Sequence, residues 1–177
     1  MDSLYAKVYQ GGYIFYFFPE DTSGLVLGLE DLKYKDYTPA NKIIWGCRNN
    51  LVGAKETKIG SGLRNTMKIS KANCTLYNTD DESWMKSAAD ICLEYKTGAY
   101  DDWYLPSKDE LHESFMKLSY TSKVEFGAFY YWTSSEKNDQ FAWIENLKSG
   151  YREYDLRGQS YFRKYYARYV RPVRNFK

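Results

Sequence analysis

Two kinds of sequence alternate in the C-terminal quarter, "YYWTSSEKNDQFAWIENLKSGYREYDLRGQSYFRKYYARYVRPVR" (Tyr130 to Arg174). The first kind consists of short apolar pieces such as "YYW", "AWIENL" and "YVRPVR". The second is rich in Tyr, Arg, Asp, Asn, Gln and Ser, with Ser-Gly and Arg-Gly turn signals. The alternation predicts short strands at "FYYWTS", "FAWIENL", "YREYDL" and "ARYVRPVR", joined by polar segments.

Helical patterns precede this region. The clearest is "PSKDELHESFMKL", where Ser107 and Glu110 have the spacing of a capping box and an apolar stripe follows. His112 lies beside that stripe, and we interpret it as a surface or boundary residue rather than a catalyst. A second helix is predicted over "DDESWMKSAADICLEYKTG", with apolar residues at one-turn spacings from Trp84 to Tyr95. The stretch after Ser61 is a third, weaker helical segment.

Strand patterns also occur near the N-terminus. Apolar-rich runs at Tyr13 to Phe18 and Gly24 to Leu29, joined by "PEDTS", predict a hairpin, and "IIWGC" (Ile43 to Cys47) predicts a short buried strand. A chain of 177 residues has the length of one domain. Strands at both ends with helices between them predict a single α+β domain over residues 1–177, whose terminal strands meet in one sheet.

The composition is ordinary for a soluble globular protein except in its aromatic residues. Hydrophobic residues make up 44% and charged residues 27%, but aromatic residues reach 19%, with 19 Tyr. Tyrosine combines an apolar ring with a hydrogen-bonding tip at small entropic cost, so it is common on adaptable binding surfaces. The alternative is that the tyrosines are core and sheet residues, which holds for many of them.

The cysteines and the apolar runs say little about function, but they bear on disulfides, metal sites and membrane segments. The chain has three cysteines, so a disulfide from Cys47 to Cys74 or Cys92 and buried free thiols both stay open. Their spacing fits no zinc pattern, and with His112 as the one histidine we expect no metal site and no cofactor. "YIFYFFP" is too short for a membrane span and has the wrong flanks for a signal peptide.

The net charge of +2 conceals a basic C-terminus. Residues 148–177 contain nine Lys or Arg against Glu153 and Asp155, a local charge of +7 that would attract anions. The alternative is that these arginines lie over aromatic rings and pair with acidic residues elsewhere.

Four blocks of the chain, in order, resemble one known family. The blocks are "DDWYLPSKDEL" (Asp101 to Leu111), "YYWTSSE" (Tyr130 to Glu136), "FAW" (Phe141 to Trp143) and "YVRPVR" (Tyr169 to Arg174). Together they are similar to the hallmarks of the Lcl C-terminal-like domain, named for the tip domain of a bacterial collagen-like adhesin. "GGYIFYFF" and "IIWGC" match its N-terminal half more loosely, so the resemblance covers nearly the whole chain.

The resemblance implies a C-type-lectin-like fold, with small antiparallel sheets, two main helices and the chain ends close together. It implies a ligand-binding module of cell-surface proteins or of phage receptor-binding parts. Many such relatives are variable proteins of diversity-generating retroelements, which rewrite the C-terminal segment over an invariant frame. The resemblance also implies a homo-oligomer, a trimer as in fibre tips.

Within this framework the block residues take structural roles. Seven apolar block residues are assigned to the core: Trp103, Leu105, Trp132, Ala142, Trp143, Val170 and Val173. Thr133, Ser134 and Ser135 are expected to bind backbone groups, and Arg171 and Arg174 to hold the frame. The region of about 137–165 is expected to display the ligand-binding residues Lys137, Asn138, Asp139, Ile144, Asn146, Tyr151, Glu153, Tyr154, Asp155, Arg157, Gln159, Tyr161, Arg163 and Tyr165. The alternative is a solvated edge that binds nothing.

Other classes of function fit the residues less well. One histidine offers no convincing Ser-His-Asp set. The formylglycine-generating enzymes, which belong to the same fold superfamily as the resembled family, need cysteines late in the chain, and here no cysteine follows Cys92. We therefore expect no catalysis and no catalytic residue. "WIEN" faintly resembles part of a calcium-dependent lectin site, but its partner motif and an oxygen-ligand cluster are absent from the sequence.

The expected function is therefore recognition without catalysis. The expected partner is a protein or glycan on another cell, with nucleic acid disfavoured, and the expected location is the cell surface or a phage virion. The alternative is a fixed adhesin domain that binds sulfated polysaccharide through its basic C-terminal region; strong dependence of binding on salt would favour it.

Overall fold

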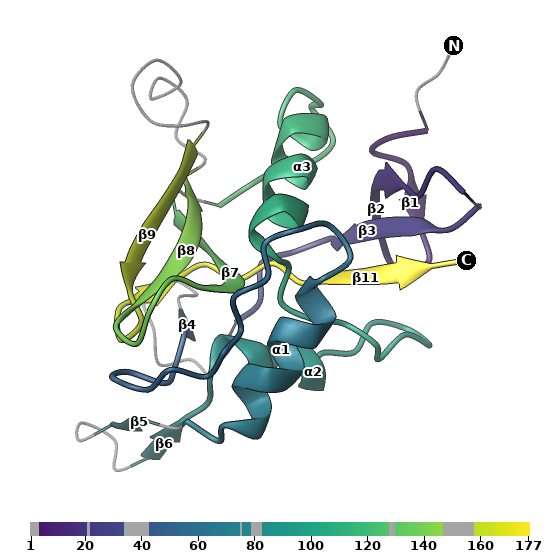
Figure 1. Ribbon diagram of the computed structural model, residues 1–177. Coiled ribbons are helices and arrows are strands. Elements are labelled where there is room, and N and C mark those ends of the chain that lie inside the picture. Colours follow the sequence, from purple (N-terminus) through teal and green to yellow (C-terminus); the bar gives the residue numbers. More distant parts are fainter. Residues whose placement is uncertain are drawn as a thin grey trace.

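The computed structural model describes residues 4–20, 22–33, 43–74, 76–78, 83–127, 130–146 and 158–177. In this part of the chain, three helices and several small antiparallel sheets form a mixed α+β fold (Figure 1). The predicted α+β class is therefore confirmed, with one helix more than the two main helices that the family resemblance implied. None of the described helices combines the length and apolar character needed to cross a membrane.

The two ends of the described chain meet in a four-stranded sheet, drawn on the right of Figure 1. Its strands, in spatial order, are β1 (Val8–Tyr9), β2 (Gly12–Phe17), β3 (Gly24–Gly28) and β11 (Val173–Phe176). The predicted hairpin is the antiparallel pair β2–β3. Strand β11 pairs with β3 from Val173 opposite Leu27 to Phe176 opposite Gly24, so the predicted meeting of the terminal strands is confirmed.

The helices α1 (Gly62–Lys71), α2 (Ala88–Glu94) and α3 (Lys108–Leu118) follow in the chain. The capping box predicted for α3 is present, with the Ser107 hydroxyl accepting from the Glu110 backbone N–H. The helix predicted over 80–98 is shorter than expected, because Ser87 and Asp90 form a capping box that starts it at Ala88. The residues before it form strand β6 (Ser83–Met85), paired with β5 (Leu76–Asn78).

A three-stranded antiparallel sheet, at the left of Figure 1, carries most of the predicted display residues that the structure describes. It contains β7 (Tyr130–Glu136), β8 (Phe141–Asn146) and β9 (Gln159–Arg163). The sequence patterns predicted β7 and β8 but not β9, and the strand predicted at "YREYDL" lies outside the described residues. A short pair of β4 (Ile43–Ile44) and β10 (Ala167–Arg168) lies beside this sheet.

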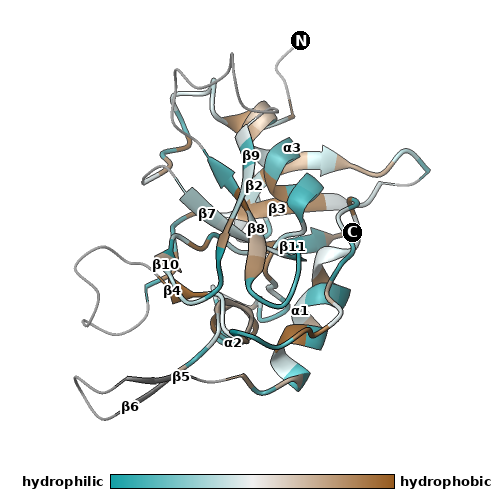
Figure 2. Cartoon of the chain, turned by 60° about the vertical axis from the view of Figure 1, so that its left-hand side comes forward, coloured by the Kyte–Doolittle hydropathy of each residue, from teal (hydrophilic) through white to brown (hydrophobic). Residues whose placement is uncertain are grey.

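The core consists mainly of block residues and N-terminal strands. Apart from Trp143, all of the block residues assigned to the core are buried: Trp103, Leu105, Trp132, Ala142, Val170 and Val173. Hydrophobic residues also run along β3 and β4 (Figure 2), whose residues are buried throughout. Cys47 and Cys74 form a disulfide, and Cys92 is a buried free thiol.

The polar block residues Thr133, Ser135 and Arg171 bind backbone groups as predicted, whereas the buried Ser134 hydroxyl has no hydrogen-bond partner among the described residues. Ser135 Oγ donates to the Glu56 carbonyl oxygen at 2.7 Å, and Thr133 Oγ1 donates to the Trp143 carbonyl oxygen at 2.9 Å. Arg171 donates to the carbonyl oxygens of Glu125 and Leu29. These bonds join β7 to β8 and to the loop around Glu56, and they join the segment before β11 to two other loops, so the blocks hold the fold together.

Glu110 is buried at the start of α3, and this burial predicts a pH dependence. Its carboxylate accepts from the backbone N–H groups of Ser107 and Gly60 at 2.7 and 2.8 Å, but desolvation by burial outweighs these bonds and raises its pKa. A carboxyl whose pKa is raised by folding stabilises the protein most when it is protonated. Its contribution is therefore present below about pH 4.5 and is lost as the pH rises through the folded-state pKa.

Substituting Glu110→Gln should remove this part of the pH dependence. The free energy of unfolding, measured by urea titration from pH 4 to 8, should fall less steeply with rising pH in the variant than in the wild type. Glu113→Gln, on the same helix but partly exposed, is the control and should leave the slope unchanged. Equal slopes in Glu110→Gln and the wild type would contradict the assignment.

Candidate functional site

Five of the predicted display residues, Tyr151, Glu153, Tyr154, Asp155 and Arg157, lie outside the described residues. The others fall on two neighbouring strands and their turns. Lys137, Asn138 and Asp139 are exposed in the β7–β8 turn, and Asn146 ends β8. Gln159, Tyr161 and Arg163 lie on β9, and Tyr165 lies in the turn that follows it. The structure therefore brings most of the described residues of this set to one side of the molecule.

The prediction that Ile144 is a ligand-binding residue was wrong, because Ile144 does not lie on the surface. Its side chain is 1% exposed and faces Trp132 across β7–β8. Trp143, predicted to be buried, is instead partly exposed. The physical reason is strand alternation: Ala142 and Ile144 share the buried face of β8, so Trp143 points to the other face.

Trp143 is the centre of an aromatic and cationic surface, which we call the Trp143 surface and which comprises Lys108, Lys137, Phe141, Trp143 and Tyr161. Trp143 lies opposite Tyr161 on β8–β9, with ring centroids 5.9 Å apart in an edge arrangement. The ammonium of Lys137 lies 4.1 Å from the Tyr161 ring centre and 4.6 Å from that of Trp143. The Lys108 ammonium lies 4.5 Å from the Trp143 ring centre. The rings are thus held on two paired strands with cations over their faces.

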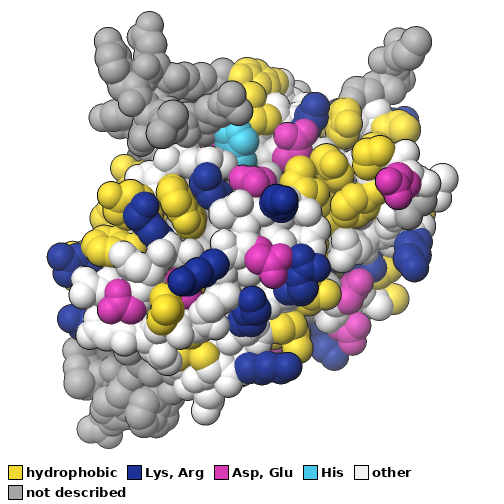
Figure 3. Space-filling view, viewed as in Figure 1, with side chains coloured by type: hydrophobic (Ala, Val, Ile, Leu, Met, Phe, Trp, Pro, Cys, Tyr) yellow, Lys and Arg dark blue, Asp and Glu magenta, His cyan; other side chains and the backbone are white. Residues whose placement is uncertain are grey.

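A second group of aromatic rings follows β9. Tyr165 and Tyr166 stack with centroids 4.6 Å apart, and the guanidinium of Arg48 lies 4.6 Å from the Tyr165 ring centre. Hydrogen bonds with Tyr166 and then with Arg163 lower the pKa of Tyr165. The Arg168 guanidinium lies 3.9 Å from the Phe162 ring centre. Figure 3 shows hydrophobic and Lys or Arg side chains intermingled over β8 and β9.

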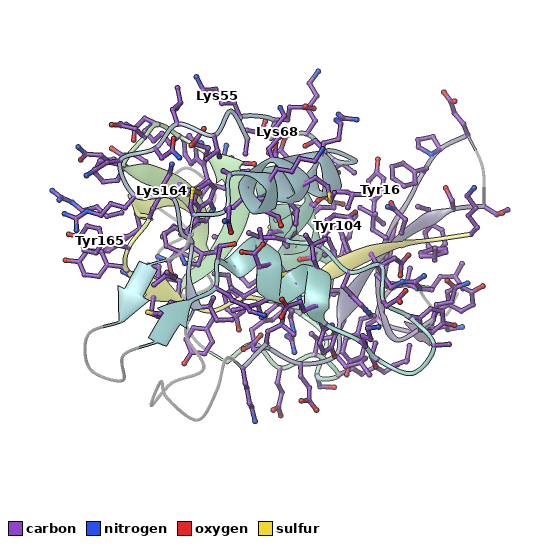
Figure 4. All side chains as sticks on the ribbon, turned by 90° about the horizontal axis from the view of Figure 1, so that it is seen from below. Tyr16, Lys55, Lys68, Tyr104, Lys164 and Tyr165 are labelled. Atoms are coloured by element: carbon purple, nitrogen blue, oxygen red, sulfur yellow. A yellow bond between two sulfur atoms is a disulfide. The ribbon has the colours of Figure 1, made fainter. Side chains whose placement is uncertain are left out.

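Beneath this turn lies a buried ion pair that the sequence reading did not foresee. Lys164 Nζ donates to Glu136 Oε1 at 2.7 Å, and both side chains are fully buried. Glu136 also accepts from the backbone N–H groups of Val52 and Gly53, both at 2.9 Å. Burial lowers the pKa of Lys164, and the Glu136 carboxylate opposes that shift. Figure 4 shows Lys164 directed inward and its neighbour Tyr165 directed outward.

Buried polar groups also connect the sheet to α3. His112 Nδ1 lies 3.1 Å from Glu145 Oε1, and Glu145 is fully buried on β8. Burial raises the pKa of Glu145, opposed by the hydrogen bond with His112. His112 is therefore a boundary residue that joins α3 to β8. No group of three or more His, Cys, Asp or Glu side chains that could hold a metal is present in the described residues.

Three of the six Lys and Arg residues described between 158 and 177 have buried side chains. Lys164 pairs with Glu136, Arg171 with Asp31, and Arg174 with Asp102, and all three basic side chains are buried or nearly so. These three cations are therefore neutralised within the frame and add little to the charge of the described surface.

Several residues of this surface were missed by sequence reasoning. Tyr166 and Phe162 lie next to predicted residues, and Phe141 is two positions from Trp143 on the same face of β8, so it was missed together with Trp143 when that face was assigned to the core. Arg48 and Lys108 carry no such signal, because their approach to Tyr165 and Trp143 depends on the tertiary fold.

Comparison with known proteins identifies no family for this chain. No known family model matches the chain, and no curated protein matches it. Among solved structures, a fimbrial protein from Bacteroides ovatus ATCC 8483 is similar over 85% of this chain, with 17% sequence identity and a TM-score of 0.45. The match covers 35% of that protein, so this chain spans about a third of its length.

Proposed function

We propose that this chain is a ligand-recognition domain that binds a protein or glycan partner on another cell and catalyses no reaction. The observation that carries the proposal is the cross-strand pair of Trp143 and Tyr161, with Lys137 within 5 Å of both ring centres. Aromatic side chains on rigid strands, next to cations, have the composition of binding hot spots. They also lose little conformational entropy when a partner covers them.

The proposal includes the C-type-lectin-like fold of the Lcl C-terminal-like domain family. Two observations support it: the first and last described strands lie in one sheet, and the blocks that carry the resemblance supply buried framework residues such as Trp103 and Trp132. A place among the variable proteins of diversity-generating retroelements is part of the same proposal. Its test is the neighbouring DNA, which should contain an imperfect repeat of the 3′ end of the gene and a reverse transcriptase gene.

The sulfated-polysaccharide alternative depends on a broad basic surface. The internal pairing of Lys164, Arg171 and Arg174 reduces that surface, so the aromatic rings explain the site better than charge alone. Salt weakens contacts between exposed charges. Binding to immobilised heparin that persists in 0.5 M sodium chloride would therefore favour contacts with the aromatic rings over binding through charge alone.

The substitutions Trp143→Ala and Tyr161→Ser, each made alone, should weaken binding strongly and leave the fold intact. Loss of a central aromatic contact typically costs about 2 kcal/mol or more, which is roughly a 30-fold loss of affinity. The probes are a printed glycan array and fixed bacterial cells, with bound protein measured by fluorescence. Thermal unfolding should change little, because Trp143 is partly exposed and Tyr161 is 45% exposed.

Tyr120→Ser is the matched control, since Tyr120 is an exposed tyrosine just beyond α3 and outside the Trp143 surface. It should keep wild-type binding. Undiminished capture by a folded double variant, Trp143→Ala with Tyr161→Ser, would show that the partner binds elsewhere or that this face is only a solvated edge.

A further inference from the structure

A small pocket opens beside the Trp143 surface, in the turn after β9. We call it the Tyr165 pocket; it is lined by Arg48, Asn49, Gln140, Arg163 and Tyr165 and has a volume of about 180 Å³. The lining comes from three separate segments: the turn after Cys47, the β7–β8 turn, and the end of β9 with its following turn. The volume is below the roughly 300–1,000 Å³ of sites that enclose a drug-sized ligand. A single small group or part of one sugar ring fits it.

The three segments are held together by Lys164. Its backbone N–H donates to the Gln140 carbonyl oxygen at 2.9 Å. Its ammonium donates to the Asn50 carbonyl oxygen at 2.9 Å and to the Cys47 carbonyl oxygen at 3.5 Å. The disulfide from Cys47 further ties the first segment to Cys74. The backbone of the three segments is therefore held in place before a ligand arrives, which lowers the entropic cost of binding.

The charge of the pocket is positive. Arg48 and Arg163 both line it, and no carboxylate is among the lining residues. In the part of the chain that the structure describes, neither guanidinium forms an ion pair with Asp or Glu. Arg48 instead lies over the Tyr165 ring. A guanidinium that stacks on a ring through its flat face still has its N–H groups, which lie in the guanidinium plane, available to donate to an acceptor. Two such groups in one pocket fit an oxyanion.

The remaining lining groups fit the hydroxyls of a sugar. The side-chain amides of Asn49 and Gln140 each offer a donor and an acceptor, and the Tyr165 ring lines the pocket beside them. The aromatic rings of Phe141 and Tyr161 continue from the pocket along β8 and β9, with the Arg163 guanidinium 5.7 Å from the Phe141 ring centre. An extended ligand seated in the pocket would therefore continue over the Trp143 surface.

We infer that the Tyr165 pocket binds the anionic group of an acidic sugar, a carboxylate or a sulfate ester held by Arg48 and Arg163. This inference deepens the proposed function and rests on it, since it assigns one ligand class to part of the proposed binding face. It differs from general polyanion binding because one pocket of fixed geometry recognises one sugar unit.

The test is nuclear magnetic resonance titration of the ¹⁵N-labelled protein with single sugars at constant ionic strength. Glucuronate, glucose 6-sulfate and glucose are the three probes, and the side-chain N–H signals of Arg48, Arg163, Asn49 and Gln140 are the readout. At least one acidic sugar should shift these signals at concentrations where glucose does not. The acidic sugar that binds identifies the anionic group as carboxylate or sulfate.

Arg48→Gln and Arg163→Gln should each weaken binding of that sugar about tenfold or more, as expected for loss of a charge-assisted bond. Arg168→Gln removes a guanidinium that lies over Phe162 outside the lining, so it is the matched control and should bind like the wild type. Arg48→Lys keeps the charge but loses the planar fork, and it should be intermediate. Thermal unfolding of each variant separates lost binding from lost folding.

Several results would overturn the inference: no shift with either acidic sugar, equal shifts with glucose, or unchanged binding in folded Arg48→Gln and Arg163→Gln. Equal binding of sodium acetate or sodium sulfate would overturn the sugar part of it. The acidic-sugar titration and the capture experiment test the pocket and the proposed function separately. Capture lost in Trp143→Ala without any acidic-sugar shift refutes the pocket alone, whereas sugar binding without capture of cells or array glycans refutes the larger role.

Discussion

Lys164→Met is expected to lower the free energy of unfolding by about 3–5 kcal/mol, the usual cost of removing one partner of a buried ion pair. The Lys164 ammonium is fully buried and donates to Glu136 and to the backbone of the turn after Cys47. Methionine fills a similar volume but leaves the Glu136 carboxylate buried without its cation. Urea unfolding followed by tryptophan fluorescence measures the loss, and Trp45, whose ring lies 4.6 Å from the ammonium, reports on this site.

Two further variants test the cause of that loss. Glu136→Gln combined with Lys164→Met removes both charges, so the double variant should regain much of the stability lost in the single one. Lys137→Met changes an exposed lysine in the next turn and should stay within about 0.5 kcal/mol of the wild type. A loss below about 1 kcal/mol in Lys164→Met would mean that water or a rearranged turn replaces the cation.

Reduction of the Cys47–Cys74 disulfide is expected to cost about 3.5 kcal/mol of stability. The bond closes a loop with a sequence separation of 27, and the chain-entropy relation gives this value for a loop of that length. Cys47 lies directly before Arg48, so reduction should also weaken acidic-sugar binding in the Tyr165 pocket. Urea unfolding with and without a phosphine reductant measures the stability difference.

Cys92→Ala identifies the pair, because Cys92 is the buried free thiol. Burial raises the pKa of this thiol well above its ordinary value, so it is a poor nucleophile for disulfide exchange. The difference between oxidised and reduced protein should persist in Cys92→Ala and vanish in Cys74→Ala. Persistence in Cys74→Ala would instead assign the bond to Cys47 and Cys92.

Local features of the chain were predictable because their causes lie within a few residues. The capping box of Ser107 and Glu110 fixes the start of α3, and two apolar-rich runs joined by a polar turn indicate the β2–β3 hairpin. The same reasoning failed before α2, where apolar spacings extended the predicted helix backward over β6. There a second capping box at Ser87, further along the chain, overrides the helical periodicity.

The candidate site was predictable only in outline. The sequence indicated a Tyr- and Arg-rich surface between about 137 and 165, but the pattern alone placed Trp143 in the core and Ile144 on the surface. Strand pairing decides this question, since Ile144 faces Trp132 on β7 while Trp143 faces Tyr161 on β9. The alternation of a strand is visible in a sequence, but which of its two faces is buried depends on its neighbours.

By itself, the sequence determined the α+β class, the N-terminal hairpin, the approximate bounds of α1 and α3, and an aromatic C-terminal region. These follow from periodicity, capping and composition, which act over a few residues. Only the tertiary structure decided that Lys164 is buried rather than displayed and that Arg48 lies over Tyr165. Both depend on groups more than 100 positions apart, Lys164 with Asn50 and Arg48 with Tyr165, and no local pattern records such a meeting.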